Sequence, residues 1–219
     1  MNMNLSNESL SLVQSTAFLG LTLDHKLQWG AHISGLAGRL SSAAFAIRKV
    51  RQLTDVDTAK LIYFSYFHSV MSYGILLWGK AADIETIFIL QKRAVRAIYN
   101  LRSRASLKEL FKEIGILTVA SQYILANIMF IKHNIHLYNK NSDIHNVNTR
   151  NKHKLVGTYH RLHKVHNSFA GLGIRLFNKL PEDIVNLPLL KFKNVIKGRL
   201  NRKGYYSVND YLNDKNAWD

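Results

Sequence analysis

The fold is decided by residues 29–50, which read WGAHISGLAGRLSSAAFAIRKV. Apolar residues recur here at alternating separations of four and three positions, which is the spacing of one face of an α-helix. The residues on this face are Trp29, Ile33, Leu36, Leu40, Ala43, Ile47 and Val50. The stretch therefore predicts a long helix with one face in a core, and a fold that is mainly α-helical.

Further helices are predicted after this stretch. A second helix should begin at the capping residues Thr54 and Asp55, reach about Met71 and be largely buried, because its polar face carries almost no charge. The helix predicted over residues 83–99 has acidic residues at its start and basic residues at its end, as the helix dipole favours. Apolar spacing also predicts helices over residues 119–138 and 189–202.

The remaining segments complete a predicted division into domains. Residues 10–24 alternate in the manner of a short strand pair, so residues 1–28 should form a β-hairpin before a helical bundle over residues 29–138. Residues 139–151 are rich in Asn and predict a polar linker. Glycine and proline interrupt residues 152–219, which predicts a basic C-terminal region that is irregular and has short helices.

Composition excludes several classes of protein. With 47% hydrophobic residues in 219, the chain has enough apolar material for a globular core. The absence of cysteine removes disulfides, thiolate metal sites and thiol nucleophiles. The N-terminus lacks the features of a signal peptide, so we expect an intracellular protein that is not secreted. Residues 61–79 are uncharged, but interrupting polar residues favour a buried helix over a membrane span.

Charge is concentrated in one part of the sequence. The chain has 30 basic and 14 acidic residues, a net charge of +16. Residues 1–85 hold 7 basic and 6 acidic groups, residues 86–206 hold 22 and 5, and residues 207–219 hold 1 and 3. Such a field attracts polyanions, either nucleic acid or an anionic membrane surface, although it could also be only a solvated basic surface.

The predicted contacts with nucleic acid are basic residues of this charged part, several beside tyrosines that could stack on bases or belong to the core. They are Lys92, Arg93, Arg96, Arg102, Arg104, Lys152, Lys154, Arg161, Lys164, Lys193, Arg199, Arg202 and Lys203. Helical spacing should let Lys92 and Arg96 project together, flanked by Arg93. We expect them to contact phosphates of RNA, DNA or an RNA–DNA hybrid without reading sequence.

No catalytic or metal-binding set is found. Nucleotide polymerisation needs carboxylates that hold two divalent metals, but the one adjacent acidic pair, Glu182 and Asp183, has the position of a first helical turn. Four histidines, at positions 153, 160, 163 and 166, have some of the spacing of metal ligands, but they lie among basic residues, which favours phosphate contact or plain surface. We therefore predict no catalytic residue, no metal, no cofactor and no small-molecule substrate.

Several short segments resemble one family in the same order along the chain. FLGLTLD, residues 18–24, resembles the hairpin at the palm end of non-LTR retrotransposon reverse transcriptases, particularly those of jockey-like elements. The other similar segments are residues 73–79 and 90–98, which look like the helices after the palm, and residues 149–150, 177–181, 192–200 and 205–212, which look like the C-terminal region.

The resemblance implies the end of a palm, a helical thumb and a C-terminal region. In that family the thumb grips a template–product duplex, while Mg²⁺ is held by a Tyr/Phe-x-Asp-Asp motif that this chain lacks. We therefore expect a fragment that binds nucleic acid without polymerising, in the nucleus or in a cytoplasmic ribonucleoprotein. The alternative is a stand-alone module that binds nucleic acid, a protein or a membrane surface.

Overall fold

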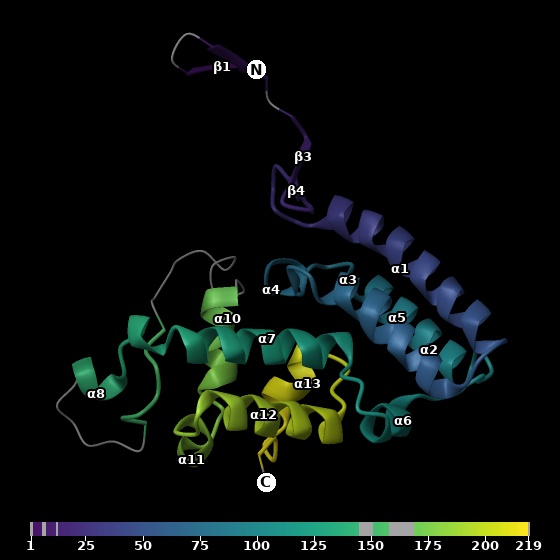
Figure 1. The fold of residues 1–219 in the computed structure, drawn as a ribbon. Coiled ribbons are helices and arrows are strands. Elements are labelled where there is room, and N and C mark those ends of the chain that lie inside the picture. Colours follow the sequence, from purple (N-terminus) through teal and green to yellow (C-terminus); the bar gives the residue numbers. More distant parts are fainter. Residues whose placement is uncertain (1, 6–7, 12, 145–150, 158–168, 219) are drawn as a thin grey trace. The chain divides into compact units, whose positions relative to one another are not determined.

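The structure is a computed structural model that describes residues 2–5, 8–11, 13–144, 151–157 and 169–218 (Figure 1). The chain forms two compact units. The first comprises Met1–Gly74 and Ala81–Tyr99, and the second comprises Ile75–Lys80 and Asn100–Asp219. Both units are built mainly from helices, and strands occur only near the N-terminus of the described chain. The prediction of a mainly α-helical fold with a short N-terminal β element is confirmed.

The strands form two antiparallel hairpins. β1 (Asn2–Leu5) pairs with β2 (Glu8–Ser11), and β3 (Ser15–Phe18) pairs with β4 (Leu21–Asp24). The second turn contains Leu19 and Gly20, both with positive φ, as the favoured two-residue hairpin turns require. The β3–β4 hairpin lies within the predicted strand pair, whereas β1 lies before it.

The core of the first unit is formed by α1 (Gly30–Arg51) against α5 (Ile84–Ile98). The middle of the predicted apolar face of α1, from Ile33 to Ile47, is buried, whereas Trp29 and Val50 at its ends are half-buried. Before α1, the carboxylate of Asp24 accepts three backbone N–H groups, including that of Trp29 at 2.7 Å, and holds the chain as it enters the helix. At the opposite end, Arg51 Nε donates to the carbonyl of Ile98 at 3.0 Å and satisfies the C-terminus of α5.

A helical segment between α1 and α5 buries only one face. It consists of α2 (Val56–Ile62), a π-helix η1 (Tyr63–His68) and α3 (Ser69–Ser72). Tyr63 and Phe67 stack with 5.3 Å between ring centroids and are fully buried. Leu61, Phe64 and Tyr66 are exposed, so the prediction of a largely buried helix is wrong. These three uncharged side chains lie on the surface instead of in the core.

In the second unit, four helices pack against α7 (Val119–His133), which carries many buried residues (Figure 1). The helices that contact α7 are α4 (Ile75–Trp78), α10 (Phe169–Phe177), α12 (Leu189–Lys203) and α13 (Val208–Asn213). The other elements are α6 (Lys108–Glu113), η2 (Ile135–Leu137), α8 (Asn141–Ile144) and α11 (Glu182–Val185).

The structure divides the chain differently from the predicted domains. The sequence places α7 with α1 and α5, followed by a linker over residues 139–151, but α7 packs with the C-terminal helices. Helix α7 packs in this way because it carries large apolar side chains, among them Tyr123, Ile128 and Ile131, which are buried against other helices.

Candidate nucleic-acid interface

The most basic element in the described chain is α12. Its sequence, LLKFKNVIKGRLNRK, contains six basic residues and no acidic residue. Phe192, Ile196 and Leu200 recur at intervals of four and are fully buried, which fixes the face that packs on the unit. The exposed cations of the helix are Lys191, Lys193, Lys197 and Arg202. Within the described residues, none of these four forms a salt bridge.

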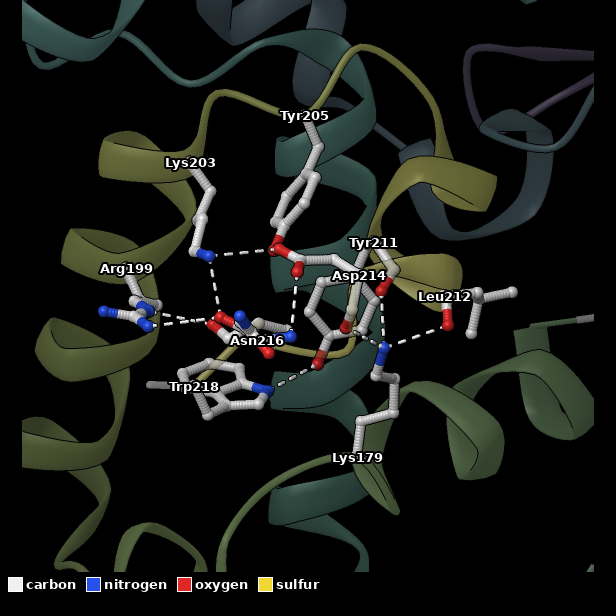
Figure 2. A network of polar contacts seen from close by, with 10 residues as sticks. Lys179, Arg199, Lys203, Tyr205, Tyr211, Leu212, Asp214, Asn216 and Trp218 are labelled. Carbon is white, nitrogen blue, oxygen red and sulfur yellow. Dashed lines mark hydrogen bonds and ion pairs between the residues drawn. The ribbon is translucent and has the colours of Figure 1, made fainter.

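The other two cations of α12 hold the C-terminal segment of the chain (Figure 2). Arg199 Nε donates to the carbonyl of Ala217 at 2.8 Å, and Lys203 Nζ donates to that of Asn216 at 2.7 Å. Lys203 Nζ also lies 3.2 Å from Asp214 Oδ2. Arg199 and Lys203, both predicted contacts with nucleic acid, are therefore committed to the internal structure of the unit.

The same network holds the side chains of Tyr205 and Tyr211 in the core of the unit. Tyr205 is buried and donates its hydroxyl to Asp214 Oδ2 at 2.6 Å, and this hydrogen bond together with Lys203 lowers the pKa of Asp214. Burial, followed by the hydrogen bond to Asp214, raises the pKa of Tyr205. Tyr211 is also buried, and Lys179 Nζ caps its helix by donating to the carbonyls of Tyr211, Leu212 and Asp214 (Figure 2). Tyr205 is thus a core residue and not a stacking platform.

Further exposed cations lie on α6, which contacts α12, and in the loop before α6. Asn201 on this helix donates to the carbonyl of Lys112 at 2.9 Å and so ties α12 to α6. Lys108 at the start of α6 is exposed, as are Arg102 and Arg104 in the loop before it. Both predicted arginines are therefore available to a ligand, on the unit that carries α12.

The three predicted cations of α5 belong to the first unit and have different surroundings. Lys92 Nζ lies 3.3 Å from Glu85 Oε1 and 4.3 Å from the ring centroid of Phe88, so an ion pair and a cation–π contact hold it. Arg96 is partly buried. Arg93 is exposed and lines a shallow hollow of about 330 Å³ between α1 and α5. The side chain of Arg93 is therefore open to a ligand, whereas that of Lys92 is held by Glu85 and Phe88.

The remaining predicted contacts lie in the second unit or outside the described residues. Lys152 is partly buried and Lys154 is exposed, both in the segment 151–157. Arg161 and Lys164, with Tyr159 and three of the four predicted histidines, lie outside the described residues. Sequence reasoning did not select Lys191 and Lys197, although the absence of any acid from residues 189–203 could have indicated both.

The acidic residues that the structure describes are not gathered into a metal site. Glu182 lies in the exposed first turn of α11 with its Oε1 3.4 Å from Nδ1 of His153. Among the described residues, no three side chains of His, Asp or Glu come together in a way that could hold a metal ion. In the same part of the chain, no helix has both the length and the hydropathy to span a membrane.

A comparison with curated proteins finds a relative described as a probable RNA-directed DNA polymerase from transposon BS of Drosophila melanogaster. The two sequences are 30% identical over 110 residues, which cover 48% of this chain and 12% of the relative. Part of this chain is related to a transposon reverse transcriptase. No protein-family model matches the chain, and no solved structure matches it.

The relationship to a transposon reverse transcriptase confirms the resemblance seen in the sequence. It also limits what can be transferred, because the match spans 12% of the length of the relative. The activity of the whole relative is therefore not assigned to this chain by the match.

Proposed function

We propose that this reverse-transcriptase-related chain binds the sugar–phosphate backbone of nucleic acid, as a duplex of template and product or as RNA, and does not polymerise by itself. The binding surface consists of the exposed cations of α12, extended by Arg102, Arg104 and Lys108. Arg93 provides a further contact on the first unit.

The observation that carries the proposal is the placement of charge on α12. Lys191 lies in the first turn of α12, where the positive end of the helix dipole disfavours cations, and Lys193 follows at the start of the second turn. No acidic residue of the helix offsets either lysine. A helix selected only for stability would carry Asp or Glu there. A polyanionic ligand removes the conflict, because its phosphates neutralise the lysines.

The dimensions of α12 suit a backbone contact. Fifteen helical residues extend over about 22 Å, and double-stranded DNA presents about one charge for each 1.7 Å along its axis. Cations at both ends of the helix can therefore reach phosphates within one turn of a duplex. Contacts of this kind position a nucleic acid without identifying its bases.

The test removes the four exposed cations of α12 together, with Lys191→Gln, Lys193→Gln, Lys197→Gln and Arg202→Gln. Binding to duplex DNA, RNA and an RNA–DNA hybrid is measured as a function of salt. We expect weaker binding to all sequences alike, and for duplex DNA a log–log salt slope that becomes shallower by about 0.9 for each phosphate that the variant no longer neutralises.

A matched control removes the same total charge elsewhere. Its substitutions are Arg48→Gln, Lys49→Gln, Lys80→Gln and Lys215→Gln, all at exposed positions outside α12. If both variants lose affinity equally, the chain responds only to its net charge and α12 is not the binding surface. Vesicles of anionic lipid are tested beside the nucleic acids, and tighter binding to them would replace the proposal with a membrane-surface function.

A further inference from the structure

A cavity of about 200 Å³ lies in the second unit beside α11, and its lining residues include none of α12. Its floor is apolar and consists of Leu155, Phe177 and Leu180, which are 4%, 3% and 9% exposed. Its rim is polar and carries Lys140, Lys154, Asn186 and the pair of His153 and Glu182. An apolar floor below a few polar groups is the usual composition of a small-molecule site.

The rim is held in place by backbone contacts. Lys140 and Leu155 form an antiparallel β-bridge, and the N–H groups of Asn141 and Val156 donate across it to the carbonyls of Lys154 and Asn139 at 3.0 and 2.8 Å. The side chain of Asn178 then bonds both the N–H and the carbonyl of Leu155 at 2.9 Å. The two lysines therefore start from fixed backbone positions.

The rim carries an excess of positive charge. Glu182 is the acidic residue that lines the cavity, and its carboxylate lies 3.4 Å from His153. Lys140 and Lys154 are exposed and, within the described residues, form no salt bridge. A ligand with an anionic group would be held at the rim by these two lysines.

We propose that the cavity receives one nucleobase, with its 5′-phosphate on Lys140 and Lys154. The volume is below the range of about 300–1,000 Å³ for pockets that enclose a drug-sized ligand, so one flat ring enters while sugar and phosphate stay at the rim. Asn186 and Glu182 offer an amide and a carboxylate to the edge of a base, groups that a purely apolar ligand would leave unpaired. This inference rests on the proposed binding of nucleic acid and adds a base pocket to it.

The experiment titrates the chain of residues 1–219 with AMP, GMP, CMP and UMP, and follows backbone amide resonances by NMR. We expect shifts at Leu155, Asn178 and Leu180, and binding of ribose 5-phosphate that is weaker by about tenfold or more, because it lacks the apolar ring. Equal affinity for ribose 5-phosphate and for all four nucleotides would overturn the inference.

Two variants test the site from opposite sides. Lys140→Gln with Lys154→Gln removes the phosphate contacts, and we expect about tenfold weaker binding of AMP for each lysine, the scale of a hydrogen bond to a charged group. Val185→Phe fills the cavity and should abolish binding. Lys80→Gln with Lys215→Gln removes the same charge at exposed positions that do not line the cavity. AMP binding that is identical in the lysine pair and in this control would contradict the assignment.

Duplex binding is measured on the same samples, which separates this inference from the proposed function. If the variant with Lys140→Gln and Lys154→Gln loses AMP binding but still binds duplex, the result supports both the proposed function and the base pocket. Duplex binding without any nucleotide binding in the natural chain overturns the base pocket alone. A comparison of an oligonucleotide that has a terminal base with one that is abasic at that position identifies the source of the base. If the abasic oligonucleotide binds more weakly, the pocket receives the end of a strand. If the two bind equally and AMP binds tightly, the pocket receives a free nucleotide.

Discussion

At the scale of single residues, the basic side chains of this protein have two different tasks. Arg51, Lys179 and Arg199 donate to backbone carbonyls and complete helix ends or hold the C-terminal segment. Lys191 and Lys193 have no such partner in the described chain. The net charge of +16 is therefore partly structural, and only the exposed remainder is available to a ligand.

Replacing Lys191 and Lys193 with Gln should affect stability and binding in opposite directions. Because Lys191 lies in the first turn of α12 and opposes the helix dipole, the double variant should be more stable by about 0.3–1 kcal/mol, while its affinity for duplex DNA falls. Urea unfolding and a salt-dependent binding assay on one preparation check both effects. A variant that loses stability as well as affinity would show that the lysines support the fold.

Asp214 should make stability depend on pH in the acid range. Its pKa is lowered in the folded state, first by the Tyr205 hydroxyl and then by Lys203, so its contribution is complete above the ordinary pKa of about 4 and is lost as pH falls through the folded value. Asp214→Asn should therefore be less stable than the natural chain at pH 7, and the gap should narrow below about pH 4. Unfolding by urea at pH 7, 4 and 3 measures the gap.

Asp183→Asn provides the matched control for that measurement, because Asp183 is exposed in the first turn of α11. A gap for Asp214→Asn that stays constant from pH 7 to pH 3 would contradict the role of its charge.

At the scale of elements, the close approach of Gly79 to α7 decides whether α4 can join the second unit. A Cβ atom at Gly79 would overlap Cδ2 of Tyr123, and this ring is 1% exposed and has its pKa raised to about 12 by burial. We expect Gly79→Ala to cost about 1–3 kcal/mol, the range for overpacking a core.

Gly38→Ala is the control on α1, where an added Cβ meets no atom within 4 Å. It should raise stability by about 0.5–1 kcal/mol because alanine is the better helix former. Thermal unfolding of both variants gives the comparison, and a loss at Gly38 equal to that at Gly79 would remove the steric explanation.

The sequence predicted the elements better than their association. Periodicity located α1, α7 and α12 to within a few residues, because local spacing determines which face of a helix is apolar. The charges at its two ends located α5. It did not predict that α4 packs on α7, since that contact joins residues more than forty positions apart. The prediction that α2 and η1 are largely buried was wrong. An uncharged face such as that of Leu61 and Phe64 has the same sequence pattern whether or not another element covers it.

The same distinction applies to the candidate interface. Counting charges located the basic part of the chain, but it could not separate Lys203 from Arg202. Lys203 turns to Asp214 and Asn216, which lie more than ten positions away, whereas Arg202 faces solvent. Only the tertiary structure shows which cations already have a partner.

At the scale of the whole molecule, we predict that the chain does not extend a primer. Two-metal polymerisation needs a set of carboxylates, and the described residues bring no such set together. Purified protein with primer, template, nucleotides and Mg²⁺ should yield no product. Extension that a point substitution in this chain abolishes would contradict the prediction and would show that the chain is catalytic.

The path of the chain between the units also has a consequence for synthesis on the ribosome. Residues 75–80 belong to the second unit, yet they emerge before α5 completes the first. During translation, residues 75–80 therefore leave the ribosome before α7, on which α4 packs, has been made. The side chain of Trp78, which is buried in the folded chain, lacks its final neighbours until then. An apolar segment that is exposed during synthesis can form wrong contacts within the nascent chain or with other chains. We therefore expect chaperones to act mainly on residues 75–80.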